Sequence, residues 1–343
     1  MKVALCSSMV PFVHGGARNI VDWLATKLTE HGHQVETVLL PHIDHPDVLF
    51  DQMAAFRWVD LSAADRLICF RPPAHHVPHD NKVLWFIHHI RRFYDLWGAS
   101  YFPDSDTTQL TGLRDALVAA DNAALGEARH VFTNSRIVSD RLATYNGVDS
   151  EVLYPPLFDP SAYQPVERND EIVAVCRLEH HKRQHLLVEA MAHTTTPVTL
   201  RLCGTGNSGY VEQLRDTIAC TALADRVILD DRWIDDDEKV NVVNRCLAAA
   251  YVPENEDSYG YPSLEAAHAA KAVLTTTDSG GVPELITDGE NGFIAEPTPE
   301  ALADAMDQLY LDRVRTERMG EANRERVGEL QIDWDHVIER ILA

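Results

Sequence analysis

The sequence predicts an α/β protein made of two Rossmann-like units, each with a parallel β-sheet covered by helices. Its 343 residues are too many for one ordinary core and suit two domains, since a domain usually has roughly 100–200 residues. Short apolar segments alternate with amphipathic helical segments through both halves, which is typical of strands buried on both faces. Residues 155–170 interrupt this alternation, because they carry four prolines and cannot hold a helix. The domain boundary is therefore expected there.

The first unit begins with an apolar strand over residues 2–8. A helix should follow the next glycine pair, because Ile20, Leu24 and Leu28 recur every four residues and give it one apolar stripe. Further strands are expected over residues 35–40, 66–70, 83–87 and 130–133, with a helix from about residue 135 to residue 145.

The second unit restarts the same pattern after the boundary. Its expected strands cover residues 172–176, 198–203, 227–229 and 248–252, and its first helices lie near residues 185–193 and 211–222. The chain ends in an apolar stripe of Trp334, Val337, Ile338, Ile341 and Leu342, which must pack against another element. These patterns predict an N-terminal domain over residues 1–160, a C-terminal domain over residues 168–325, and a terminal helix within residues 326–343 that returns to the N-terminal domain.

The composition limits the classes of partner. The 30 Lys and Arg residues against 53 Asp and Glu residues give a net charge of −23, which excludes nucleic acid as the main partner. No apolar run approaches the roughly 18–20 residues that span a bilayer, and the first residues lack the apolar region of a signal peptide. We therefore expect a cytoplasmic protein with at most peripheral membrane contact. Six scattered cysteines without a C-x-x-C pair predict reduced core residues.

A basic loop follows the first strand of the second unit. Residues 177–183 read RLEHHKR and lie between a strand end and a helix start, where open α/β sheets bind ligands and the helix dipole favours negative charge. Arg177 can make a bidentate contact and Lys182 can supply a point charge, so the loop is a candidate diphosphate site. A solvated loop with surface cations is the alternative, and the spacing alone does not separate the two.

Two glycine-containing segments follow. Gly204 and Gly206 end the next strand and let the backbone pass close to a ligand, although they do not form the full dinucleotide fingerprint, which disfavours hydride transfer. Residues 253–266 read PENEDSYGYPSLEA, in which Pro262 suits a helix start. Glu265 would accept hydrogen bonds from ribose hydroxyls while the backbone N–H groups of the loop hold phosphate or sugar. Ordinary capping of a helix by acidic residues is the alternative.

The order of these motifs resembles the retaining glycosyltransferases of family 4. The resemblance rests on the basic loop at residues 177–183, the glycines at 204–206, the acidic segment at 257–266, GGVPELI at 280–286 and DGENGF at 288–293. It extends more loosely over the N-terminal half. It implies the GT-B fold, an α/β architecture in which two Rossmann-like domains face each other across a cleft, with the acceptor side in the N-terminal domain and the nucleotide sugar bound by the C-terminal domain.

The resemblance implies roles for individual residues of the second unit. Arg177 and Lys182 would hold the donor diphosphate and stabilise it as it leaves, which needs no metal. Glu265 would hold the nucleotide ribose. The position eight residues before it is usually Glu and faces the donor sugar, but here it is Asp257, which is one methylene shorter. The neighbouring Glu256 is the rival for this role.

The resemblance also implies contacts from the first unit. His88 matches a histidine near the donor sugar, and His89 would replace it if the register differs by one residue. The other nucleotide-sugar contacts that it implies are Gly16, Gly204, Gly206, Ser258, Tyr259 and Gly260. Residues 235–237, three consecutive Asp, are expected to be an exposed loop rather than a metal site, and neither a metal nor a cofactor is implied.

The predicted function is that of a metal-independent, retaining glycosyltransferase. It would move a sugar from a nucleoside diphosphate to the hydroxyl of a glycan, a lipid-linked sugar or a small molecule. No side chain is placed as an obvious nucleophile, so the acceptor hydroxyl would attack from the face that the diphosphate leaves. Two alternatives stay open: a nucleotide-sugar epimerase of similar shape, and a catalytically silent subunit that binds the nucleotide sugar for a partner.

Overall fold

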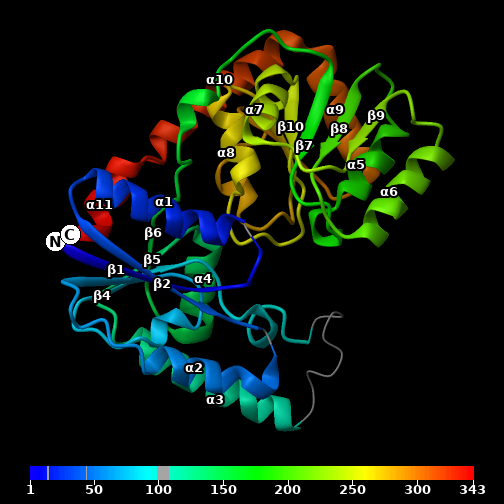
Figure 1. Cartoon of the computed structure of the whole chain (residues 1–343). Coiled ribbons are helices and arrows are strands. Elements are labelled where there is room, and N and C mark those ends of the chain that lie inside the picture. Colours follow the sequence, from blue (N-terminus) through cyan, green and yellow to red (C-terminus); the bar gives the residue numbers. More distant parts are fainter. Residues whose placement is uncertain (14, 44, 99–107) are drawn as a thin grey trace. The chain divides into compact units, whose positions relative to one another are not determined.

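The structure is a computed structural model that describes residues 1–13, 15–43, 45–98 and 108–343. It divides into two compact units (Figure 1). Unit 1 comprises Met1–Pro155 together with Trp334–Ala343, and unit 2 comprises Pro156–Asp333. Each unit contains a six-stranded parallel sheet with its own core. The predicted α/β class with two Rossmann-like units is therefore confirmed.

The sheet of unit 1 has the strand order β2-β1-β3-β4-β5-β6, with all neighbouring strands parallel. Its strands are β1 (Lys2–Met9), β2 (Gln34–Pro41), β3 (Arg66–Cys69), β4 (Lys82–Phe86), β5 (His130–Thr133) and β6 (Glu151–Val152). Its helices are α1 (Gly16–Glu30), α2 (Leu49–Arg57), α3 (Thr108–Leu125), α4 (Arg136–Asn146) and α11 (Trp334–Leu342), with short 3-10 turns η1 (Pro46–Val48), η2 (Ala74–His76) and η3 (Arg91–Phe93).

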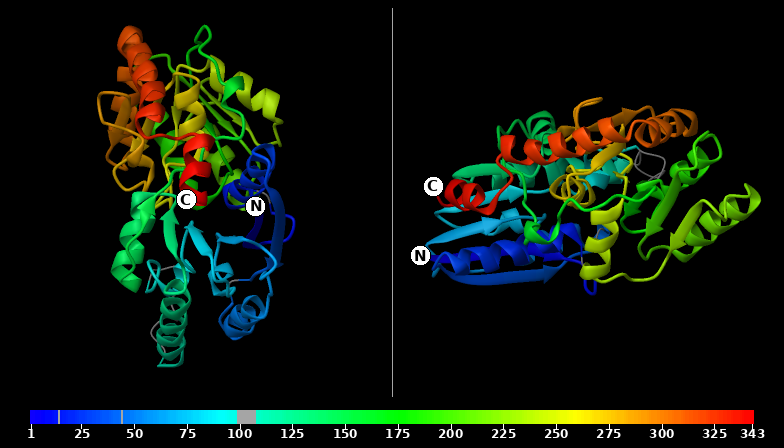
Figure 2. Two further views of the ribbon diagram at one scale, coloured as in Figure 1. Left: turned by 90° about the vertical axis from the view of Figure 1, so that its left-hand side faces the viewer. Right: turned by 90° about the horizontal axis from the view of Figure 1, so that it is seen from above.

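Side chains alternate along the strands of unit 1, so each face of the sheet packs against its own apolar core. In β1, Val3 and Leu5 pack with α1 and α11, whereas Ala4 and Cys6 face the opposite core, which α2, α3 and α4 cover. The apolar stripe of α11 completes the first core, so the end of the chain packs against the sheet on which it begins. The two termini accordingly lie at the same end of unit 1 (Figure 2).

The sheet of unit 2 has the strand order β12-β11-β10-β7-β8-β9. Its strands are β7 (Glu171–Val175), β8 (Thr199–Cys203), β9 (Val227–Asp230), β10 (Ala248–Ala250), β11 (Ala272–Thr276) and β12 (Gly292–Ala295). Its helices are α5 (Gln184–Met191), α6 (Ser208–Cys220), α7 (Asp236–Arg245), α8 (Tyr261–His268), α9 (Pro299–Leu311) and α10 (Arg313–Glu329), with 3-10 turns η4 (Pro160–Ala162), η5 (His180–Lys182) and η6 (Val282–Glu284).

The direction of strand addition reverses between β7 and β10. The chain adds β8 and β9 on one side of β7, then crosses to place β10, β11 and β12 on the other side. In open parallel sheets, ligands bind outside the carboxyl ends of the strands at such a reversal. The loops that follow β7 and β10 are therefore the expected binding loops of unit 2, and they are the segments that carry Lys182 and Glu256.

One expectation for unit 2 is wrong in its local structure. Asp235 does not lie in an acidic loop: it caps the N-terminus of α7, where its Oδ1 accepts a hydrogen bond from the Glu238 backbone N–H at 2.8 Å. Asp236 and Asp237 form the first turn of that helix, where negative charge is favourable. The three acids thus serve helix formation.

Two other expectations concern the cysteines and the membrane. All six cysteines are unpaired, and four of them are fully buried. Within the described parts of the chain, none of the helices has both the length and the apolar character that a bilayer crossing requires.

Candidate functional site

Lys182 lies at the centre of a hydrogen-bonded triad in unit 2. Its Nζ donates to the Tyr251 hydroxyl oxygen at 2.7 Å and forms an ion pair with Glu256, while the Tyr251 hydroxyl donates to Glu256 Oε2 at 2.8 Å. The Lys182 side chain is only 10% exposed and that of Glu256 23%. Burial alone would raise the pKa of Glu256, but the Lys182 ammonium and the Tyr251 hydroxyl hold it below its ordinary value. The triad therefore keeps a charged ammonium and a charged carboxylate side by side.

Arg177 lies in the loop between β7 and η5, two residues after the end of β7, and its side chain is exposed. Gln184 fixes the backbone there, because its Nε2 donates to the Arg177 carbonyl at 2.8 Å. Burial raises the pKa of the neighbouring Cys176 thiol to about 11, and Lys182 and Arg177 each offset part of that rise. Both cations thus act on the carboxyl end of β7, where an anionic ligand would meet them.

The loop after β10 is held by backbone hydrogen bonds to the turns after β7 and β11. The Glu254 N–H donates to the His181 carbonyl at 2.7 Å, and the Gly281 N–H donates to the Glu256 carbonyl at 2.9 Å. Gly280 has φ +65°, and a Cβ on it would lie 2.1 Å from the Glu256 carbonyl oxygen. Only glycine fits there, so the pair Gly280-Gly281 forms the surface on which the loop rests.

Glu265 is buried in a second ion pair. Its Oε1 lies 2.9 Å from Lys239 Nζ, and Tyr163 donates a hydrogen bond to the same carboxylate. Burial raises the pKa of Glu265 above its ordinary value even though Lys239 opposes the rise. Burial would lower the pKa of Lys239, but Glu265 and Asp236 outweigh it and leave that pKa raised. Glu265 lies in the second turn of α8, which begins at Tyr261.

The glycines after β8 contact protein backbone. A Cβ on Gly206 would lie 1.9 Å from the Leu178 carbonyl oxygen, and Gly204 approaches the Cys176 carbonyl in the same way. The Leu178 N–H donates to the Thr205 carbonyl at 3.0 Å, which extends the pairing of β7 and β8 beyond the strands. These glycines are therefore required by the neighbouring segment, the one that carries Arg177, whether or not a ligand is bound.

The remaining predicted contacts of unit 2 lie at the start of α8. Ser258 is half-buried, and its Oγ accepts a hydrogen bond from the Gly260 N–H at 3.3 Å. Tyr259 is buried, and Gly260 is the N-cap of α8. The backbone of this segment thus leads directly into a helix N-terminus.

In unit 1, the structure distinguishes the two adjacent histidines. His89 is buried, donates from Nε2 to Asn146 Oδ1 (2.9 Å) and packs against the Tyr94 ring, so it belongs to the core. His88 is half-buried, and its Nδ1 donates to the His89 carbonyl at 2.6 Å, which leaves Nε2 as the acceptor nitrogen. Burial and the nearby Arg71 lower the pKa of His88 to about 4, so its ring is neutral at pH 7. Gly16 is exposed and begins α1.

One group of described residues brings metal-ligating atoms together. In unit 1, His75, His76 and Asp121 are buried, with their ligand atoms within 4.8 Å of one another. Asp121 already accepts hydrogen bonds from His75 Nε2 at 2.8 Å, His76 Nε2 at 2.9 Å and the Tyr94 hydroxyl at 2.5 Å. These three bonds satisfy the buried carboxylate: the two histidines tie η2 to α3, and Tyr94 ties the end of η3 to the same helix.

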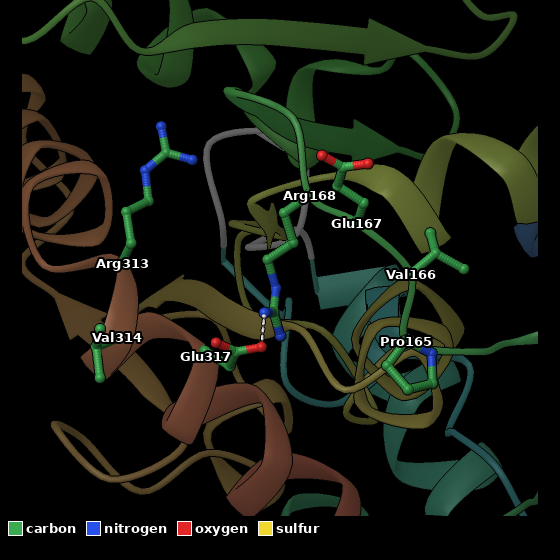
Figure 3. Close-up of a pocket in the computed structure, with 7 residues that line it drawn as sticks. All are labelled: Pro165, Val166, Glu167, Arg168, Arg313, Val314 and Glu317. Carbon is green, nitrogen blue, oxygen red and sulfur yellow. Dashed lines mark ion pairs between the residues drawn. The ribbon is translucent and has the colours of Figure 1, made fainter.

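Unit 2 also has a separate hollow of about 590 Å³, which lies between residues 165–168 and the start of α10 (Figure 3). Its two arginines are paired: Arg168 with Glu317 at 2.7 Å and Arg313 with Asp170 at 2.5 Å. The hollow contains none of the predicted site residues. Its cations are already neutralised, so it offers an anion less than the exposed Arg177 does.

Comparison with known proteins assigns the family. Residues 158–326, nearly all of unit 2, match the family described as Glycosyl transferases group 1. The chain belongs to this family. Across 214 residues it is 30% identical to the alpha-maltose-1-phosphate synthase of Mycolicibacterium smegmatis, which covers 57% of this chain and 54% of that protein. Over 262 residues it is 25% identical to the human alpha-1,3/1,6-mannosyltransferase ALG2, covering 67% of this chain and 62% of that protein.

Solved structures match the fold over almost the whole chain. A sucrose-phosphate synthase from Thermosynechococcus elongatus superposes with a TM-score of 0.79 at 16% identity, covering 98% of this chain and 96% of that one. Anabaena Alr3699/HepE in complex with UDP and glucose gives a TM-score of 0.70 at 18% identity, covering 98% of both chains. The fold of this group 1 chain is thus GT-B-like. The chain spans only about half the length of the maltose-1-phosphate synthases that it matches.

The sequence motifs pointed to the family, but they did not reveal which side chains bond the predicted site residues. Tyr251, Tyr163 and Lys239 were not singled out, although each bonds a predicted residue. Arg183 was noted only as part of a basic run. The signal for Lys239 is weak in the sequence, because it lies 26 residues before Glu265 on another helix. Tyr251 could have been suspected as a polar group at the end of an apolar strand.

Proposed function

We propose that the chain is a retaining glycosyltransferase that moves a sugar from a nucleoside diphosphate to an acceptor hydroxyl without a metal. The observation that carries the proposal is the placement of Arg177 and Lys182 together at the carboxyl end of β7, at the reversal point of the unit 2 sheet. Two such cations can neutralise a diphosphate, and each charge-assisted hydrogen bond contributes roughly 1.5–3 kcal/mol when partly desolvated. Family membership supports the same reaction class.

The proposed reaction takes place on one face of the sugar. The bond between the anomeric carbon and the β-phosphate oxygen breaks, and the acceptor oxygen forms its bond to that carbon on the same side. The acceptor proton passes to the departing phosphate oxygen. Arg177 and Lys182 stabilise the negative charge that grows on the diphosphate, which lowers the barrier because the charge is larger in the transition state than in the bound donor.

Recognition of the sugar is assigned to Glu256 rather than to Asp257. Glu256 is the carboxylate that lies against Lys182, so a diphosphate bound at Lys182 would bring its sugar towards Glu256. Glu265 is proposed to accept a ribose hydroxyl, because a carboxylate engaged by one lysine and one tyrosine has lone pairs to spare. The roles expected for His88, Gly16 and the segment Ser258–Gly260 stay predictions, as does location in the cytosol, which the six unpaired cysteines favour.

The test is a thermal-shift screen with UDP, GDP, UDP-glucose and GDP-mannose, followed by an assay for sugar transfer and donor hydrolysis. UDP-glucose is the first choice because HepE was solved with it. A ligand at 100 times its dissociation constant should stabilise the fold by about 2.7 kcal/mol. Arg177→Ala should abolish the shift, whereas Arg215→Ala, which removes an exposed arginine of α6, should keep it.

Each contrary result has its own meaning. A flat response to all four ligands would reject the donor site. Binding without transfer or hydrolysis would favour the silent subunit, and release of an epimerised nucleotide sugar without an acceptor would favour the epimerase.

A further inference from the structure

Arg183 follows Lys182 directly and has a backbone that few arginines adopt. Its φ is +54°, in the left-handed region, and it connects η5 to α5. Its side chain is about one-tenth exposed. Glycine would adopt this conformation without strain, so we expect the arginine side chain to make contacts that offset the strain of the backbone.

The buried guanidinium of Arg183 makes five hydrogen bonds to two segments. It donates to the carbonyls of Val252 (2.8 Å) and Pro253 (2.9 Å), to Thr276 Oγ1 (2.8 Å), and to both carboxylate oxygens of Asp278 (2.7 and 2.6 Å). The first two acceptors follow β10, and the others end or follow β11. A planar guanidinium presents five N–H donors in a fixed fork, so it can reach acceptors in both segments at once, whereas an ammonium has only three donors.

These segments are the ones that position the Lys182 triad. Val252 and Pro253 lie between Tyr251 and the loop that carries Glu256. The carbonyl of Asp278, beside the carboxylate that Arg183 holds, accepts from the Asn255 N–H at 3.0 Å. The guanidinium therefore ties the turn that carries Lys182 to both sides of the loop that carries its partner.

We propose that Arg183 is a positioning residue, which holds Lys182 against Tyr251 and Glu256 without touching the substrate itself. The geometric part of this inference is independent of the reaction. Its consequence for turnover rests on the proposed glycosyl transfer. Arg183 accordingly differs from Arg177: both are cations of the same loop, but the Arg177 side chain is exposed, whereas the Arg183 guanidinium is fully engaged in hydrogen bonds within the protein.

The positioning can be measured on Lys182 directly. The chain has six lysines, so acetylation by an N-hydroxysuccinimide ester can be followed at each one by peptide mass spectrometry. Arg183→Gly removes the guanidinium and all five of its hydrogen bonds, and glycine tolerates the left-handed backbone without strain. We expect the acetylation rate of Lys182 to rise at least about tenfold, while Lys27, which lies in α1 of unit 1, keeps its rate.

Three further variants keep the test decisive. Asp278→Asn weakens the hydrogen bonds of Arg183 by changing an exposed residue. It is the test that remains if Arg183→Gly fails to fold. Arg183→Lys should give an intermediate rate, since it restores the charge but not the fork. Glu256→Gln should expose Lys182 to the reagent in the same way and so calibrates the readout.

Turnover separates the two proposals. With UDP-glucose as donor, kcat of Arg183→Gly should fall at least about tenfold at saturation. If acetylation of Lys182 stays within twofold of the unmodified protein in Arg183→Gly and Asp278→Asn, the positioning role is overturned. If acetylation rises but the unmodified protein binds no nucleotide, the positioning role stands and the proposed reaction is the part that fails.

Discussion

Replacement of Glu256 by glutamine tests which carboxylate of the acidic loop serves the site. The change keeps the shape of the side chain but removes the negative charge beside the Lys182 ammonium. Both side chains are less than one quarter exposed, so solvent screens the pair only in part. A hydrogen bond to a charged group contributes roughly 1.5–3 kcal/mol, and Glu256→Gln should lower the free energy of unfolding at pH 7 by about that amount.

The pH dependence of this loss has a definite sign. The pKa of Glu256 is depressed below its ordinary value of 4.5, mainly because Lys182 overcomes the effect of burial. The stabilisation is therefore fully present above 4.5 and disappears as the pH falls through the folded-state pKa. Denaturant unfolding at several pH values should show the two proteins differing most near pH 7 and converging in acid.

Transfer should discriminate Glu256 from its neighbour. Glu256→Gln should reduce sugar transfer by at least about tenfold, which corresponds to roughly 1.4 kcal/mol in the barrier. Asp257→Asn is the matched control, because it makes the same chemical change one position along the same loop and should cost less. If Asp257→Asn loses transfer while Glu256→Gln stays within twofold, the assignment from the Lys182 pair is refuted and the spacing of eight residues was the better guide.

Three more predictions follow from the described contacts. Glu265→Gln should weaken UDP and UDP-glucose equally in calorimetry, since its proposed contact is to ribose; loss of UDP-glucose binding alone would move it to the sugar. Gly280→Ala should destabilise unit 2 and weaken donor binding, because its Cβ would overlap the Glu256 carbonyl; an unchanged melting temperature would contradict this. Desolvation lowers the pKa values of His42, His88 and His89 to about 4, so stability should fall between pH 6.5 and 4 as the unfolded chain takes up protons first, and His88→Asn should make the slope of melting temperature against pH shallower.

The fold could be predicted because its signals are local. The apolar stripe Ile20, Leu24 and Leu28 is buried in α1, as its four-residue spacing required. The short apolar segments could be predicted as parallel strands, because a strand buried on both faces has few polar positions. Helix α7 was missed because its acidic start resembled a loop, although acids are favourable there.

The site was predictable only where its residues belong to one segment. Arg177 and Lys182 lie in the one loop between β7 and α5, so the sequence alone places them at the same end of the sheet. Glu256 bonds Lys182 across 74 positions, and the choice between Glu256 and Asp257 depends on which way an extended loop turns each side chain. That direction is set by contacts such as Gly280 against the Glu256 carbonyl, which no spacing within the loop reveals.

A net charge of −23 is compatible with the proposed diphosphate site. Long-range repulsion from the acidic surface is screened within about 8–10 Å at physiological salt, so contacts inside the site decide the outcome. Lys182 cannot stand alone there, because a partly buried ammonium without a counter-charge is costly. Glu256 supplies that charge while no ligand is bound. A diphosphate at Lys182 would replace Glu256 as the ammonium's partner, and the released carboxylate would then be available to a sugar hydroxyl, so the same ion pair stabilises the empty site and provides both groups that the proposed reaction needs.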